Sequence, residues 1–168
     1  MTESSREAAL TGGCQCGALR YALYVVPKKG VHLCHCRMCQ KAVGGPFAAL
    51  APVSLEDFAW TRGEPGTFAS SSVALRDFCA NCGTPLTFRY RDSGRINVTV
   101  GSLDRPQDVP PELHFGIEGR IAWLDGIAGL PTESTENHMT ADRQAKLVNH
   151  QHPDHETADD WTPRSAGS

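Results

Sequence analysis

The sequence predicts a mainly β fold made of short strands with little helix. Many short runs rich in Val, Tyr, Phe and Thr are separated by turns that contain Gly or Pro, a pattern typical of β domains. No amphipathic helix of three turns is recognisable before residue 138. The chain also carries seven cysteines in three tight clusters, which indicates that apolar packing is not the only interaction that stabilises it.

The expected elements follow one another from residue 18 to residue 123. An alternating run over 18–26 meets the Pro27–Gly30 turn, and 32–36 leads into a cysteine cluster. A short helical turn is expected over Met38–Val43, ended by the Gly44-Gly45-Pro46 sequence. The remaining strand candidates are 47–53, 58–60, 67–69, 73–78, 86–90, 96–100, 114–117 and 122–123, with a hairpin turn at Arg91–Gly94.

Composition limits the kind of protein that this chain can be. Its 168 residues suit one domain with a tail, and its formal charge of −3 argues against a basic nucleic-acid binder. No apolar run approaches the roughly 18 residues of a membrane span. The first residues, MTESSREAALTGG, lack the basic and apolar regions of a secretory signal, so a cytoplasmic location is expected.

Charge and composition change after Pro131. Residues 1–131 carry 13 Lys+Arg and 12 Asp+Glu, whereas residues 132–168 carry 3 and 7. We therefore expect a disordered start over 1–11, a folded domain over 12–131 and a polar, acidic tail over 132–168. Within this largely mobile tail, Thr140 can cap a short helix over 140–150.

The cysteines indicate metal binding more strongly than disulfides. Cysteines one or two residues apart close very small loops and make poor structural disulfides, and an odd number leaves one thiol unpaired. In a reducing compartment such thiols persist as thiols or metal thiolates. Thiolates favour zinc or iron–sulfur, and zinc takes four ligands in a tetrahedron. The cysteines are Cys14, Cys16, Cys34, Cys36, Cys39, Cys79 and Cys82.

Seven thiols divide naturally into a group of four and a group of three. Cys14/Cys16 and Cys79/Cys82 can together close a structural site, since Gly17 and Gly83 follow each pair and allow the tight turn that a metal knuckle needs. The other three can hold a second ion with one open position. Two alternatives stay open: a cysteine of the last pair joins the middle three, or His32, His35 or His114 completes a second structural site.

The motifs resemble those of the glutathione-dependent formaldehyde-activating enzyme (Gfa/CENP-V-like) family. The matching segments are GGCQCGALRY at Gly12–Tyr21, CHCRMCQKAVGGPF at Cys34–Phe47, FCANCGTPLTFRY at Phe78–Tyr90 and VTVGSLDRP at Val98–Pro106, with a looser match over Pro111–Pro131. The resemblance covers about residues 12–131. It implies a zinc-ribbon-related (Mss-four-like) β fold stapled by zinc.

The resemblance also implies roles for the cysteines. The residues that match Cys14, Cys16, Cys79 and Cys82 bind a structural zinc in the family, and those that match Cys34, Cys36 and Cys39 bind a second, exchangeable zinc at the active site. The implied activity is that of a carbon–sulfur lyase or synthase, which condenses formaldehyde with glutathione to S-(hydroxymethyl)glutathione or acts on a related small thiol adduct.

Two further residues are candidates for this chemistry. Glutathione carries two carboxylates, and Lys41, together with its neighbour Arg37, lies beside the middle cysteines in sequence. His114 can orient substrate or relay a proton near pH 7. The expected partner is a small-molecule thiol such as glutathione, with neither nucleic acid nor membrane, and a homodimer stays an open question.

Two other classes of function compete with the enzyme hypothesis. One is a non-catalytic, zinc-stabilised binding module, which a permanent protein ligand on the middle cysteines would favour. The other is a thiol-redox or metal-storage protein, since C-x-x-C pairs can be redox-active. Stoichiometric zinc that resists mild oxidation would argue against the second alternative.

Overall fold

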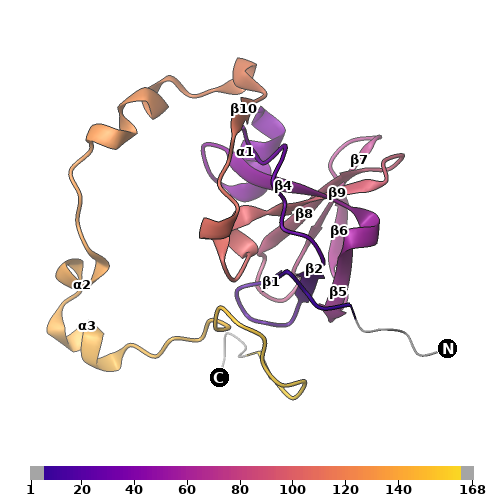
Figure 1. Cartoon of the computed structure of the whole chain (residues 1–168). Helices are drawn as coiled ribbons and strands as arrows, with labels where there is room; N and C mark the ends of the chain where they lie inside the picture. Colours follow the sequence, from indigo (N-terminus) through magenta and orange to yellow (C-terminus); the bar gives the residue numbers. More distant parts are fainter. Residues whose placement is uncertain (1–5, 164–168) are drawn as a thin grey trace.

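The structure is a computed structural model that describes residues 6–163, and it contains two β-sheets (Figure 1). The larger sheet has seven strands in the order β10-β3-β4-β9-β8-β7-β6, and the smaller has three in the order β1-β2-β5. All neighbouring strands pair antiparallel except β10, which runs parallel to β3 at one edge of the larger sheet. The predicted mainly β fold is therefore confirmed.

The elements are short, as the turn-rich sequence predicts. The strands are β1 (Leu10–Gly13), β2 (Arg20–Leu23), β3 (His32–Cys34), β4 (Ala48–Ser54), β5 (Phe58–Arg62), β6 (Gly66–Ala69), β7 (Ala74–Phe78), β8 (Pro85–Tyr90), β9 (Arg95–Thr99) and β10 (Leu113–Phe115). The α-helices are α1 (Arg37–Val43), α2 (Thr135–His138) and α3 (Ala141–Lys146). Short 3-10 helices are η1 (Leu55–Asp57), η2 (Val100–Ser102), η3 (Pro106–Asp108), η4 (Ile117–Gly119) and η5 (Ala122–Gly129).

One apolar cluster joins the two sheets. Tyr21 from β2 is fully buried, and its ring packs against those of Phe58 and Trp60 from β5. Leu86 and Val98 of the larger sheet belong to the same cluster and are also fully buried. The Tyr21 hydroxyl is not left unpaired in this apolar environment, because it lies 2.7 Å from the hydroxyl of Ser102. The core therefore sits between the sheets and fixes β2 relative to η2.

The larger sheet positions the segment that carries Cys34, Cys36 and Cys39. β4 pairs with β3 on one side, with Cys34 opposite Ala48, and with β9 on the other. Helix α1 follows β3 directly and ends where Gly44 takes a left-handed conformation with φ of 65°. This is the helical turn expected over Met38–Val43.

The N-terminal boundary of the domain lies earlier than predicted. Residues 1–11 were expected to be disordered, yet β1 begins at Leu10, and the Ala9 amide donates to the Leu23 carbonyl at 2.8 Å. Leu10 is buried in the main core. The short LTGG strand was missed because its two glycines carry no β-propensity signal. Residues 1–5 of that prediction lie outside the described residues.

The tail differs from its prediction in one part. Residues 132–150 do extend away from the body, carrying α2 and α3, as the orange arc in Figure 1 shows. Thr140 caps a helix as expected, but the helix ends at Lys146 rather than at residue 150. The chain then returns, and residues 152–161 pack against the loop between β1 and β2, so this part of the tail is held by the domain. Residues 164–168 lie outside the described residues.

Two further differences concern strand limits. The strand predicted over 18–26 is confined to Arg20–Leu23, since residues 14–19 form a turn. The strand predicted over 122–123 is instead the start of the 3-10 helix η5, in which Trp123 is 59% exposed. Within residues 6–163, no helix is long and apolar enough to cross a membrane.

Candidate metal centres

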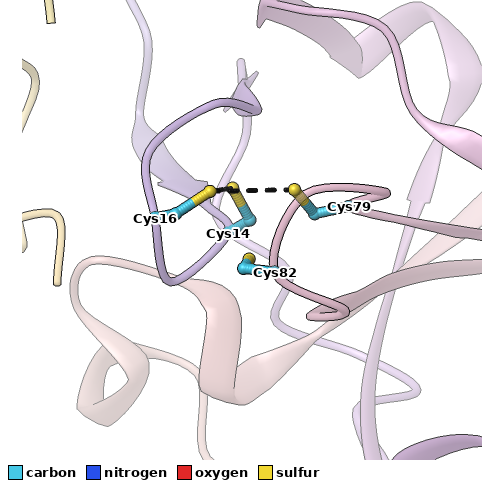
Figure 2. Close-up of side chains that lie close together, drawn as sticks. All are labelled: Cys14, Cys16, Cys79 and Cys82. Carbon is cyan, nitrogen blue, oxygen red and sulfur yellow. Dashed lines mark hydrogen bonds between the residues drawn. The ribbon is translucent and has the colours of Figure 1, made fainter. Parts of the chain in front are cut away.

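The structure brings four cysteines from two distant loops to one point. Cys14 and Cys16 lie on the loop between β1 and β2, and Cys79 and Cys82 lie on the loop between β7 and β8 (Figure 2). The four sulfur atoms lie within 4.8 Å of one another, with Cys16 Sγ 3.6 Å from Cys14 Sγ and 3.8 Å from Cys79 Sγ. A tetrahedral zinc with Zn–S bonds of about 2.3 Å requires sulfur separations of about 3.8 Å. The geometry of this four-cysteine cluster therefore fits zinc.

The two loops fold alike because each has a glycine in the same place. Gly17 and Gly83 both adopt φ of 77°, a conformation that L side chains rarely take. In each loop the glycine amide donates to the carbonyl of the first cysteine, Gly17 to Cys14 at 3.0 Å and Gly83 to Cys79 at 2.8 Å. These turns direct polar hydrogens at sulfur: the Leu19 amide lies 3.2 Å from Cys14 Sγ, and the Asn81 side-chain amide lies 3.2 Å from Cys16 Sγ.

The environment shifts the thiol pKa in opposite directions at different positions of this cluster. Burial raises the pKa of Cys14 and Cys79 above the ordinary thiol value, because a charge there is poorly solvated. Burial also opposes ionisation of Cys82, but hydrogen bonds from the Thr84 side chain and backbone outweigh it and lower the pKa of Cys82 to about 6. A divalent cation is the group that would let all four ionise together, so metal binding must release protons.

The other three cysteines form a second cluster at the start of α1. Cys34 ends β3, Cys36 precedes the first residue of α1, and Cys39 lies in the first turn of the helix. Their sulfur atoms also lie within 4.8 Å of one another, with Cys34 Sγ 3.5 Å from Cys36 Sγ. Burial raises the pKa of Cys34 to about 12. For Cys36, backbone hydrogen bonds of α1 outweigh burial and lower the pKa.

No histidine completes this three-cysteine cluster in the described part of the chain. His35 lies between two of the cysteines in sequence, but its ring packs on Phe47 and its Nε2 lies 2.8 Å from Nδ1 of His114. His32 Nδ1 bonds to the Gly30 carbonyl at 2.8 Å. The cysteines of the last pair belong to the four-cysteine cluster. Among residues 6–163, these three sulfur atoms converge without a histidine or carboxylate in the group.

Lys41 and His114, the two residues predicted for catalysis, lie near the three-cysteine cluster in different ways. Lys41 is exposed in the last turn of α1, the helix that carries Cys39. His114 lies on β10, beside β3, and its side chain is exposed apart from its contact with the buried His35. Within residues 6–163, neither side chain forms a hydrogen bond to a cysteine sulfur, so their catalytic roles stay predictions.

Arg76 is a site residue that the sequence alone did not reveal. It lies on β7, and its guanidinium donates to Cys39 Sγ at 3.3 Å. The guanidinium also stacks over the ring of Phe88, with 4.8 Å between its carbon and the ring centre. Arg76 and Cys39 are 37 positions apart in the sequence, and no spacing rule connects them. The strand order, which places β7 within reach of α1 across the sheet, is what creates the contact.

A cavity of about 290 Å³ adjoins Arg76. It opens between α1, β4 and β7, and its wall is mainly apolar, formed by Val43, Leu50, Phe68 and Phe78 among others. Leu50 and Val43 also pack against Cys34 and Cys39, so the cavity wall and the three-cysteine cluster share side chains. Its lining within residues 6–163 includes no cysteine, so the cavity meets the three-cysteine cluster only through these shared side chains.

The returning tail covers the outer side of the four-cysteine cluster. The Trp161 indole donates to the Cys16 carbonyl at 2.9 Å, and the His152 amide donates to the Gln15 carbonyl at 2.8 Å. The rings of His152 and Trp161 pack edge to face, and a β-carbon on Gly17 would lie 2.3 Å from the His152 ring. Gly17 is thus required by both its conformation and this contact. The tail covers the four-cysteine cluster on this side only, because a cavity of about 390 Å³ borders Cys14 and Cys82.

Fold and site together define a small β protein with one cluster of four thiols and one cluster of three. The sequence model of the glutathione-dependent formaldehyde-activating enzymes matches residues 9–118, about two thirds of the chain. The chain belongs to this family, as its motifs predicted.

Two curated relatives agree with this assignment, and a solved structure shares the fold. An uncharacterized lyase of Schizosaccharomyces pombe is 35% identical over 79 residues, which are 47% of this chain and 56% of that protein. A Halomonas elongata protein named as a glutathione-dependent formaldehyde-activating enzyme is 26% identical over 142 residues, 74% of this chain and 90% of that protein. A Rhodobacter sphaeroides crystal structure has the same fold, with a TM-score of 0.50 and 24% identity over 62% of this chain and 98% of that one.

The family and these names support the predicted enzyme class, a carbon–sulfur lyase. Both cysteine clusters can hold a metal ion, which is consistent with the expected zinc.

Proposed function

We propose that the chain is a zinc-dependent carbon–sulfur lyase or synthase, which condenses formaldehyde with glutathione to S-(hydroxymethyl)glutathione or acts on a related small thiol adduct. The observation that carries this proposal is the contrast between the two clusters. Four sulfurs can fill the coordination of a structural zinc, whereas three sulfurs would leave one position of a zinc for a substrate sulfur.

The donor set supports this choice of metal and substrate. Cys34, Cys36 and Cys39 would hold the second zinc, and Cys14, Cys16, Cys79 and Cys82 the first. A zinc bound by three thiolates is electron-rich, so it suits a soft thiol better than a hard water molecule. When bound, such an ion ionises the substrate thiol, which is mostly protonated at neutral pH with a pKa near ~8.5.

The chain's own residues would bind and orient the two reactants. Lys41 and Arg37 on α1 would bind the carboxylates of glutathione, since both lie on the helix that carries Cys39. The cavity against Leu50 and Val43 would hold the aldehyde with little water. In the condensation, the thiolate sulfur forms a bond to the aldehyde carbon, and the carbonyl oxygen takes up a proton. Because the uncatalysed addition is facile, holding the reactants together supplies much of the acceleration required.

His114 is the proposed proton relay. Its ring contacts His35, whose pKa is lowered by burial and by the nearby charges of His114 and Arg120, so His35 is neutral at pH 7. A neutral His35 can fix the tautomer of His114 through their 2.8 Å contact, and this leaves Nε2 of His114 to exchange a proton with substrate or solvent.

The location and extent of the functional unit belong to the same proposal. A reducing compartment, the cytoplasm, would keep seven thiols unoxidised for metal binding. We propose the zinc-binding domain over residues 12–131, extended by β1 from Leu10 and covered by residues 152–161 of the tail.

The test combines metal content with exchange kinetics. Zinc is measured in the wild type and in Cys36→Ser, and the interconversion of formaldehyde, glutathione and their adduct is followed by exchange NMR. We expect Cys36→Ser to lose one zinc and the acceleration while keeping its fold. An unchanged exchange rate in the zinc-loaded wild type, relative to buffer, would count against a catalytic role and favour a zinc-stabilised binding module.

A further inference from the structure

Arg76 brings a positive charge to the three-cysteine cluster from a different element of the fold. Its terminal nitrogen lies 3.3 Å from Cys39 Sγ, a sulfur that is only 4% exposed. The guanidinium is held in place by the Phe88 ring, which faces it from the paired position on β8. Its Nε is buried and has no hydrogen-bond partner among residues 6–163, so the group is not committed to another acceptor at that nitrogen.

The nearby acidic side chain does not neutralise this charge. Asp77 follows Arg76 on β7, but its two carboxylate oxygens accept hydrogen bonds from Thr67 and Thr87, each at 2.7 Å. Arg89 of β8 is the cation that faces Asp77, with 3.6 Å between the Arg89 Nε and a carboxylate oxygen. Arg76 therefore remains available to the sulfur atoms, while Arg89 on the adjacent strand is the cation that pairs with Asp77.

Charge arithmetic shows what such a cation would do. Three thiolates and one divalent ion sum to −3 + 2 = −1. A fourth ligand that is itself a thiolate would have to bind a negatively charged, largely buried site, which electrostatic repulsion opposes in a low-dielectric environment. One guanidinium in hydrogen-bond contact with a ligand sulfur brings the site to zero before the substrate binds.

We propose that Arg76 is the residue that allows the three-cysteine cluster to accept a fourth, anionic sulfur ligand. This inference rests on the proposed function, since it requires a metal ion on Cys34, Cys36 and Cys39. Arg76 acts through the charge and the ligand sulfur of the site. It is a positioning residue, and its effect is on any thiolate, whether or not the thiol carries carboxylates.

The test uses the full chain with cobalt(II) in the three-cysteine cluster and zinc in the four-cysteine cluster. Thiol binding is followed by the sulfur-to-cobalt charge-transfer absorption as glutathione or 2-mercaptoethanol is added, with imidazole as a neutral ligand for comparison. The variants are Arg76→Met and Arg76→Lys. Arg89→Met is the matched control, because it removes the same charge on the adjacent strand without touching a cysteine.

We expect Arg76→Met to weaken the binding of both thiols about tenfold, which corresponds to about 1.4 kcal/mol of binding free energy. The binding of imidazole should stay unchanged. Arg76→Lys should recover part of the affinity, and Arg89→Met should stay within about twofold of wild type. The charge-transfer band of Arg76→Met should move to lower energy before any thiol is added, because Cys39 loses a hydrogen bond to its sulfur. Should Arg76→Met fail to fold, Arg76→Lys alone still tests the band shift and the thiol-to-imidazole ratio.

Two results would overturn the inference. One is weakened binding of glutathione alone, which would make Arg76 a carboxylate-binding residue. The other is equal loss of thiol and imidazole affinity, which would make its role purely structural. A chain whose three-cysteine cluster takes up no cobalt would overturn the proposed function itself, and this is established before any Arg76 variant is compared.

Discussion

Arg20 and Asp104 form a buried ion pair that joins the four-cysteine cluster to the end of the larger sheet. The two residues lie 84 positions apart, and Arg20 donates to Asp104 Oδ1 at 2.9 Å with a second bond to Oδ2. Their side chains are 2% and 8% exposed. Arg20 begins β2 directly after the loop of Cys14 and Cys16, and it also binds Glu156 of the returning tail. The Arg20 guanidinium thus connects the loop of Cys14 and Cys16 to the segment after η2 and to the tail.

Removing the Asp104 charge should destabilise the fold. Asp104→Asn leaves Arg20 buried without its main counterion, and breaking such a buried pair costs about 3–5 kcal/mol. Chemical denaturation followed by fluorescence measures the change. Asp108→Asn is the control, because its pair with Arg105 is exposed and should contribute less than about 1 kcal/mol. Equal stabilities of the two variants would contradict the role of the buried pair.

The same pair predicts a loss of stability in acid. Burial would raise the pKa of Asp104, but the hydrogen bonds from Arg20 and Thr11 outweigh it and hold the pKa below its ordinary value of 3.8. A carboxyl whose pKa is lower in the folded state stabilises the fold above the ordinary pKa and loses that contribution as the pH falls through the lowered one. The difference in unfolding free energy between wild type and Asp104→Asn should therefore shrink below about pH 4. A difference that is constant from pH 6 to pH 3 would refute this account.

The two cysteine clusters should respond differently to mutation. Cys82→Ala opens the four-cysteine cluster, which joins loops far apart in the sequence, so the variant should lose its zinc and become insoluble or lose its cooperative thermal transition. Cys36→Ser should lose one zinc and keep a melting temperature close to that of the wild type. Calorimetry and metal analysis on both variants test this. A stable, zinc-containing Cys82→Ala protein would show that the four-cysteine cluster is not structural.

The tail should slow the escape of metal from the four-cysteine cluster. Trp161→Ala removes the indole that bonds to the Cys16 carbonyl and packs on His152, and the loss of one such buried hydrogen bond, at about 1 kcal/mol, predicts about fivefold faster zinc transfer to a chelator. Trp123→Ala is the matched control, because Trp123 is exposed on η5. Identical transfer rates for the two variants would show that the tail does not protect the metal.

Lys41 and His114 predict separate kinetic signatures. Lys41→Gln should raise KM for glutathione several-fold with kcat little changed, since an exposed lysine that binds a carboxylate contributes about 1 kcal/mol. His114→Gln should lower kcat with KM for glutathione little changed, because a proton relay acts on the chemical step. Lys28→Gln, in the loop before β3, serves as the control for loss of a surface lysine. A Lys41→Gln variant with wild-type KM would remove this residue from the proposed site.

Much of the site was predictable because its signals are local in sequence. The spacing of the pairs and the glycine after each of them favoured the grouping of Cys14/Cys16 with Cys79/Cys82, and the structure, not the spacing, excludes a cysteine of the last pair from the middle three. Short strands between Gly and Pro turns likewise predicted the mainly β fold and the helical turn at α1.

The missed features depend on long-range contacts. Arg76 reaches Cys39 only through the strand order of the larger sheet, and Trp161 reaches Cys16 across 145 residues of sequence. In the tail, low hydrophobicity predicted mobility, but hydrogen bonds that join His152, Thr157 and Trp161 to Gln15, Arg62 and Cys16 of the domain hold residues 152–161. A composition average does not report such specific polar contacts.

The late return of the chain imposes an order on biosynthesis. Every sulfur of the four-cysteine cluster has left the ribosome once Cys82 and the few residues after it emerge. The cluster can therefore take up its ion while the rest of the polypeptide is still being made. Trp161 and Glu156 are translated much later, and only then are Cys16 and Arg20 covered. A nascent chain arrested between these two moments would hold its metal in a loop still open to cellular chelators.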